Sequence, residues 1–72
     1  MKHLRVIFDN GRGGSGEVKH YLTSDENAAA VLADMKAGRA MALEQHNEDR
    51  MVRVYTTYVR ADQVKLIEVM DR

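Results

Sequence analysis

The chain has 72 residues, and its 11 Lys and Arg residues balance its 11 Asp and Glu residues, so the formal net charge is zero. This balance excludes the overall basic charge of many nucleic-acid-binding domains, although a local basic face is compatible with it. The sequence has no cysteine, which excludes disulfides, thiolate metal sites and thiol nucleophiles. A small domain without disulfides is typical of the cytoplasm. Residues 1–10 lack the apolar run of a signal peptide or a membrane span, so we expect no membrane association.

A chain of this length has room for a single domain, residues 1–72, with one small core. At this size the free energy gained by burial and the conformational entropy lost on folding nearly cancel. Neither a disulfide nor a metal-ligand set is evident in the sequence to add stability. We therefore expect a homo-oligomer, because self-association buries further apolar surface.

Two short segments near the start of the chain alternate between apolar and polar residues, as strands do. They are HLRVIF, residues 3–8, and EVKHYL, residues 17–22. The antiparallel register that joins their apolar sets on one face has these cross-strand pairs: Phe8 with Val18, Val6 with His20, and Leu4 with Leu22. The segment between the strands, residues 9–17, is then a long and flexible hairpin loop.

The stretch TSDENAAAVLADMKAG predicts a helix over about residues 24–37. Thr23 or Ser24 is the expected N-cap, and Thr23 with Glu26 fits a capping box. The apolar stripe at helical spacing consists of Ala28, Val31, Leu32 and Met35. Gly38 is the expected stop signal at the C-terminal end of the helix.

The remaining chain predicts three strands separated by two polar breaks. In chain order these segments are the strand 39–45, the turn 46–49, the strand 50–59, the break 60–63 and the strand 64–70. Met41 and Leu43 are expected to face the core. The element order ββαβββ predicts an α+β fold, a small mostly antiparallel sheet with one helix on one face. Many small bacterial and phage domains share this order, which is too generic to identify a family.

Glycines at positions 11, 13 and 16, followed by Val18, spell G-x-G-x-x-G-x-V. A dinucleotide-binding loop needs a helix directly after its glycines, whereas a strand-like segment follows here. The other motifs of a protein kinase are absent, so we expect a mobile hairpin loop. In the alternative interpretation the loop closes over a phosphate or an acidic partner surface. The residues of that alternative site are Arg12, Gly13, Gly14 and Ser15.

The face opposite the expected core carries basic, aromatic and branched side chains. The expected partner-binding residues on it are Arg5, Ile7, Lys19, Tyr21, Arg53 and Tyr55. In the register given above, Arg5 lies across from Tyr21, which is a cation–π arrangement. Such a face suits a protein interface, and in its chemistry it also resembles a platform for single-stranded nucleic acid. The zero net charge favours the protein interface.

The three imidazoles do not predict a metal site. The expected register places His20 on the apolar face and His3 on the other, while His46 is expected in a turn. No nucleophile and base can be paired, so we expect no catalytic residue, no metal and no cofactor. The predicted function is a non-catalytic interaction protein that forms a homo-oligomer through the second sheet face or a strand edge and binds another protein. Nucleic acid is the alternative partner, and a small phosphorylated ligand at the glycine loop is the third.

Overall fold

The structure, a computed structural model, describes residues 1–12, 14–47, 49 and 52–71. Its elements in chain order are β1 (Lys2–Asp9), β2 (Ser15–Thr23), α1 (Asp25–Ala37), β3 (Met41–Asn47), β4 (Val52–Val59), a 3-10 turn (Ala61–Gln63) and β5 (Val64–Asp71). The predicted α+β class and the order ββαβββ are confirmed. Within the described part of the chain, no helix has the length and apolar character needed to cross a bilayer.

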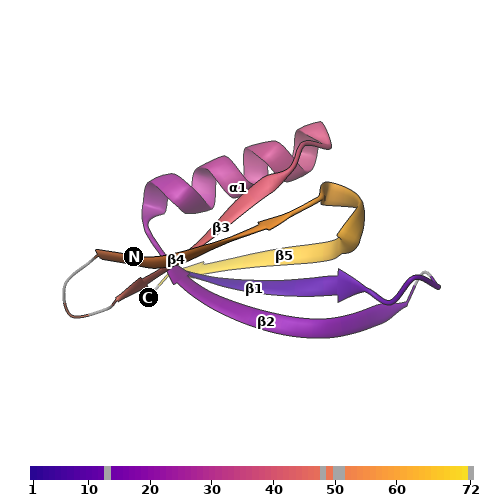
Figure 1. The fold of residues 1–72 in the computed structure, drawn as a ribbon, viewed down its shortest axis with the longest axis horizontal. Helices are drawn as coiled ribbons and strands as arrows, with labels where there is room; N and C mark the ends of the chain where they lie inside the picture. The colour runs from indigo at the N-terminus through magenta and orange to yellow at the C-terminus, as the bar shows by residue number, and fades with distance from the viewer. Residues whose placement is uncertain (13, 48, 50–51, 72) are drawn as a thin grey trace.

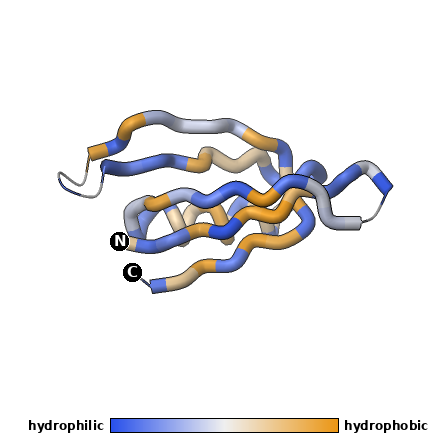
Figure 2. The backbone as a smooth tube through the Cα atoms, turned by 90° about the horizontal axis from the view of Figure 1, so that it is seen from below, coloured by the Kyte–Doolittle hydropathy of each residue, from blue (hydrophilic) through white to orange (hydrophobic). Residues whose placement is uncertain are grey.

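The strands pair antiparallel throughout, in two groups. β1 is the central strand of a three-stranded sheet with the order β2-β1-β5, and β3 pairs with β4. The helix α1 covers one side of the strands (Figure 1). The β3–β4 pair lies beside the three-stranded sheet (Figure 2), where the Leu22 amide donates a 3.0 Å hydrogen bond to the Gln45 side chain. β4 and β5 therefore lie at opposite ends of the strand array.

The helix begins and ends where local signals place it. The Ser24 hydroxyl accepts the N–H of Asn27 at 3.0 Å, so Ser24 is the N-cap. The predicted capping box of Thr23 with Glu26 is wrong, because Thr23 ends β2 and donates its buried hydroxyl to Asn27 instead. Gly38 ends the helix with a φ of 74°, in the left-handed region that glycine tolerates best.

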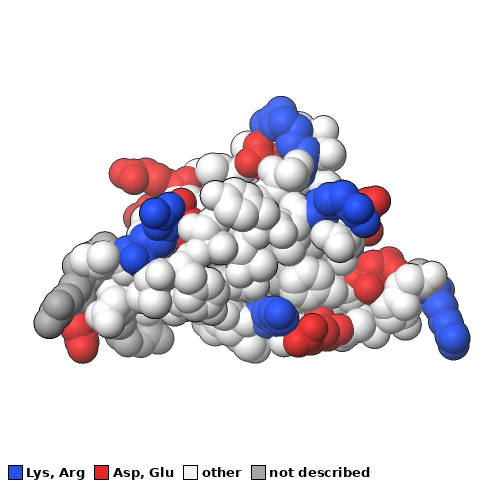
Figure 3. All heavy atoms as spheres, viewed as in Figure 1, with Lys and Arg blue, Asp and Glu red and all other residues white. Residues whose placement is uncertain are grey.

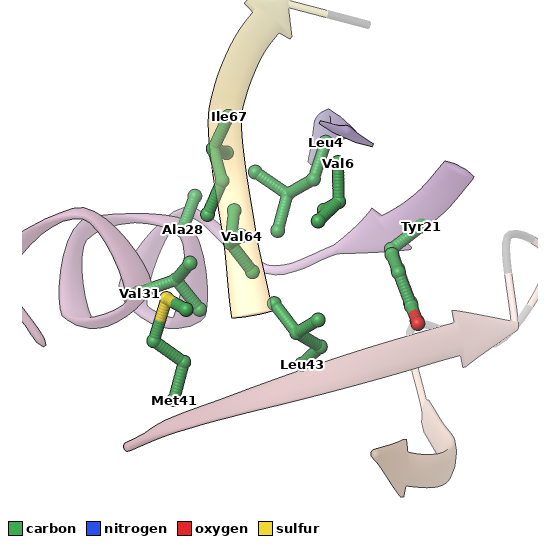
Figure 4. Packing of buried hydrophobic residues seen from close by; sticks show 9 residues of the cluster. All are labelled: Leu4, Val6, Tyr21, Ala28, Val31, Met41, Leu43, Val64 and Ile67. Carbon is green, nitrogen blue, oxygen red and sulfur yellow. The ribbon is translucent and has the colours of Figure 1, made fainter. Parts of the chain in front are cut away.

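The core lies between the three-stranded sheet, α1 and β3 (Figure 4). Its buried residues are Leu4, Val6, Tyr21, Ala28, Val31, Met41, Leu43, Val64 and Ile67. Met41 and Leu43 face the core as predicted and are fully buried. Leu32 was expected in the apolar stripe of the helix but is 42% exposed, so the stripe that packs is narrower than predicted.

The register of the first hairpin differs from the predicted one by a single residue. Val18 pairs with Ile7 rather than with Phe8, and Tyr21 pairs with Leu4. Because side chains alternate between faces, this slip turns every β2 side chain to the other side. Tyr21 is therefore 3% exposed and lies in the core, whereas Val18 and His20 are exposed. The expected pairing of Arg5 with Tyr21 is wrong, since Arg5 lies opposite His20.

Several boundaries also differ from those expected. The segment between the first two strands is shorter than the predicted loop 9–17, because β1 continues to Asp9 and β2 begins at Ser15. β3 extends into the predicted turn as far as Asn47. Residues 48, 50 and 51 of the predicted turn and strand lie outside the described residues. The predicted break at 60–63 is confirmed as the 3-10 turn before β5.

Two ion pairs connect β1 to β5, one between Lys2 and Asp71 and the other between Arg5 and Glu68. The hydrogen bond from Lys2 and its positive charge lower the pKa of Asp71, and the same contacts raise the pKa of Lys2. Both groups of that pair are open to water, where screening leaves an ion pair with little effect on stability.

Candidate functional site

Two side chains, Asp9 and Asn10, organise the glycine loop. The Asp9 carboxylate accepts the N–H of Gly11 at 2.6 Å. The Asn10 carboxamide oxygen accepts the N–H groups of Arg12 at 2.8 Å and of Gly14 at 3.1 Å. Gly11 has a φ of 82°, and a Cβ at Gly16 would lie 3.1 Å from the carbonyl oxygen of Phe8. At these two positions the backbone conformation or the close approach of the chain accounts for the glycine. Gly13 lies outside the described residues.

A hollow of about 440 Å³ lies beside this loop, lined by Phe8, Asp9, Asn10, Gly11, Gly16, Glu17, Asp62 and Gln63. Its three ionisable residues, Asp9, Glu17 and Asp62, are all acidic. Arg12 is exposed and takes no part in the lining, while the Lys65 ammonium lies 3.4 Å from the Ser15 hydroxyl. A phosphate in this hollow would meet carboxylates, and two of the loop N–H groups already bind Asn10. The geometry therefore gives no support to the anion-binding alternative.

The three-stranded sheet has one face on the core and a second face, here called the uncovered face, which no helix or strand of the described residues overlies (Figure 2). The strand registers place nine residues on the uncovered face: His3, Arg5 and Ile7 of β1, Val18, His20 and Leu22 of β2, and Leu66, Glu68 and Met70 of β5. Across the three strands, one row on this face consists of Ile7, Val18 and Leu66. The middle row consists of Arg5, His20 and Glu68.

The six predicted partner-binding residues are not brought together. Arg5 and Ile7 lie on the uncovered face, where Arg5 is paired with Glu68 and Ile7 is buried, with only 9% of its surface exposed. Tyr21 is buried in the core. Lys19 is on the same side of β2 as Tyr21 but is exposed. The last two residues of the set, Arg53 and Tyr55, belong to β4 in the other sheet.

Two polar contacts were not anticipated from the sequence. On the uncovered face, His3 Nε2 lies 2.9 Å from His20 Nδ1. On β3, His46 Nε2 lies 2.9 Å from the Glu44 carboxylate, and His46 belongs to a strand rather than to the predicted turn. The first contact was hidden by the register error, since a one-residue slip separates the two imidazoles. Within residues 1–12, 14–47, 49 and 52–71, no group of three or more His, Cys, Asp or Glu side chains is arranged to hold a metal ion.

Among the residues that the structure describes, the most exposed large apolar side chains lie on β4. Val54 is 60% exposed, Tyr55 51% and Tyr58 75%. β4 pairs with β3 alone among the described strands, so its other edge is open. A bulge interrupts that pairing between Tyr55 and Arg53, and residues 55–59 pair regularly with β3. Figure 3 shows an uncharged central area on this view of the molecule, with Lys, Arg, Asp and Glu around its border.

No protein-family model, curated protein sequence or solved structure matches the chain.

Proposed function

We propose that this protein is a non-catalytic interaction module whose first partner is a second copy of itself, joined through the open edge of β4. The observation that carries the proposal is the exposure of Tyr55 and Tyr58 on this strand edge. These tyrosines are three positions apart and so project to opposite faces of the strand. A strand that docks against this edge would cover apolar surface on both faces and add main-chain hydrogen bonds.

β4 lacks most of the features with which proteins protect an exposed edge strand. Such edges normally carry several charges, a proline or an irregular backbone. β4 has one charged residue, Arg53, and no proline, and its bulge lies before the regular segment 55–59. β5, at the opposite end of the array, has Lys65, Glu68 and Asp71. The contrast between the two edges favours β4 as the pairing edge.

The uncovered face of the three-stranded sheet is the less suitable interface. Its middle row holds Arg5, Glu68 and His20, whose polar groups would lose water in a face-to-face contact. Burial of such groups costs free energy unless each finds a new partner. A second β4 strand would bring no carboxylate, and each copy would contribute only one formal charge.

Pairing at β4 would leave the glycine loop accessible. The described loop residues, 10–12 and 14, lie at the end of the molecule away from the two chain termini (Figure 1). Arg12 and Ser15 are both exposed in this region. We propose that the loop is the part that an oligomer presents to another macromolecule, and the acidic hollow beside it suits a basic segment of that partner.

Replacement of Tyr58 by lysine is expected to dissociate the oligomer. The change places a charge on the pairing edge and removes an aromatic contact, so the dissociation constant should rise by a factor of about 30 or more. Light scattering at micromolar concentration measures the mass, and circular dichroism checks that the fold is retained. The matched variant Val18→Lys puts the same charge on the uncovered face and should leave the mass unchanged. Dissociation by Val18→Lys alone would assign the interface to that face instead.

Single-stranded nucleic acid is the second candidate partner, because Arg53 and Tyr55 are both exposed on a strand without acidic residues. If phosphate contacts carried this binding, Arg53→Ala would weaken it more at low salt than at high salt. We expect instead that the wild-type protein gives no mobility shift with single-stranded DNA or RNA at low salt. A shift that Arg53→Ala reduces would favour nucleic acid over the protein partner.

A further inference from the structure

We propose that His3 and His20 form a binding site for one transition-metal ion of the class that imidazole favours, Cu(II), Ni(II) or Zn(II). The two rings come from neighbouring strands, β1 and β2, and both lie on the uncovered face. His3 Nε2 and His20 Nδ1 are 2.9 Å apart, and the ring centroids are 5.0 Å apart. Neutral imidazole is the commonest metal ligand among side chains.

The separation of the two nitrogens fits coordination of a common ion. Metal–imidazole bonds are about 2.0–2.1 Å long, so two nitrogens 2.9 Å apart subtend an angle of about 90° at an ion bound to both. That is the angle between neighbouring ligands in the square-planar or tetragonal sites of Cu(II) and Ni(II). A tetrahedral Zn(II) site needs a slightly wider separation, which a small rotation of either ring about its broad χ2 torsion provides.

The surroundings leave room for the rest of the coordination shell. A hollow of about 210 Å³ adjoins the rings and is lined by His3, His20, Tyr21, Leu22 and Gln45. Its volume admits several water molecules, which would complete a shell that begins with two protein ligands. The neighbouring Arg5 would repel a cation, but its charge is offset by the ion pair with Glu68.

The two ligands are held by the strand pairing rather than by a flexible segment. His3 lies opposite Leu22, and His20 lies opposite Arg5, so the histidines are diagonal neighbours across the β1–β2 ladder. In the unfolded chain they are separated by sixteen intervening residues. An ion that binds both rings therefore binds the folded chain in preference to the unfolded one, and it should stabilise the fold by linkage.

The test is a thermal unfolding titration of the full chain after removal of adventitious metal with a chelator. With Ni(II) or Zn(II) at a hundredfold excess over its dissociation constant, the Tm should rise by roughly 10 °C or more. Mg(II), which prefers oxygen ligands, should leave the Tm unchanged. His20→Ala and His3→Ala should each abolish the rise, whereas the matched variant His46→Ala, which removes an imidazole from β3, should retain it.

A free amino terminus followed by a histidine at position 3 can chelate Cu(II) or Ni(II) by itself, through the terminal amine and main-chain amides. In the folded protein the Met1 amine pairs with Asp25 at 3.4 Å and His3 is held in β1. His20→Ala separates the two sites, because His20 takes no part in a terminal chelate. A Tm rise that survives in His20→Ala, or the absence of any rise in the wild-type chain, would overturn the proposal.

Nuclear magnetic resonance gives a readout that requires no variant. Zn(II) added to the wild-type chain should shift the ring C–H signals of His3 and His20 together, with one binding curve, before those of His46 move. Movement of His3 alone or of His46 first would also overturn the proposal, leaving the contact between His3 and His20 as an ordinary hydrogen bond between two neutral rings.

Discussion

Replacement of Tyr21 by alanine is expected to lower the free energy of unfolding by about 3–5 kcal/mol, as truncation of a buried aromatic residue usually does. Tyr21 is 3% exposed and is part of the core cluster with Leu4 and Val6 of the neighbouring strand. A 72-residue domain has a total stability of about 4–11 kcal/mol, so much of the variant should be unfolded at room temperature. Urea unfolding followed by circular dichroism, at one fixed protein concentration, measures the loss.

The same measurement distinguishes the two registers of the first hairpin. Val18 is 39% exposed and lies on the uncovered face, so Val18→Ala should cost less than about 1 kcal/mol. In the register predicted from the sequence, Val18 and His20 would face the core and Tyr21 would face solvent. A large loss for Val18→Ala together with a small one for Tyr21→Ala would therefore show that the predicted register is correct and that β2 is misplaced.

Asn27→Ala is expected to lower the free energy of unfolding by about 2–4 kcal/mol, although Asn27 is a polar residue on a helix. Its side chain is 8% exposed and joins three elements. The Asn27 oxygen accepts the Thr23 hydroxyl at 2.9 Å and the Glu44 N–H at 3.3 Å, while its nitrogen donates to the Ala42 carbonyl at 2.9 Å. Alanine leaves these partners inside the protein without the bonds that Asn27 supplied, and a desolvated polar group without a partner is destabilising.

Asn10→Ala is the matched control for this effect. Asn10 also binds main-chain groups, but it does so in an exposed loop, where water can replace the lost bonds. In the same urea experiment, Asn10→Ala should lower the free energy of unfolding by less than about 1 kcal/mol. A double-mutant cycle of Asn27→Ala with Thr23→Val isolates the buried hydrogen bond between these two residues. Equal and small losses for Asn27→Ala and Asn10→Ala would contradict the bridging role of Asn27.

The parts of the fold that depend on local signals could be predicted from the sequence. Ser24 supplies the N-cap oxygen of α1, and Gly38 supplies the left-handed residue after it, so both helix ends follow from residue chemistry. Met41 and Leu43 are large apolar residues at alternate positions, next to the small Ala42 and the charged Glu44, and their inward orientation follows from the period of two. The last strand was predicted at residues 64–70 and is observed as β5, but the prediction did not say which of its sides faces the core.

The register of β1 with β2 could not be predicted in this way, because β2 offers apolar residues on both of its faces. One face of β2 carries the aliphatic residues Val18 and Leu22, whereas the large apolar residue on the opposite face is Tyr21. A count of apolar side chains therefore selects the wrong face as the one that packs on the core. The deciding contacts come from α1 and β3, which are distant in the sequence and enclose Tyr21 in the core. The contact between His3 and His20 could not be predicted either, because it exists only in the observed register. Asn27 gave no signal, since a polar residue in a helix ordinarily faces water.

The proposed pairing of β4 with a second copy is the central claim, and sedimentation equilibrium of the wild-type chain at several micromolar concentrations tests it most directly. One copy has a mass of 8.2 kDa. We expect a mass of twice this value or a higher multiple, which falls toward one copy on dilution or in Tyr58→Lys. A mass of one copy at every concentration, together with cooperative unfolding, would contradict the account, because the chain would then be a stable monomer with its β4 edge exposed.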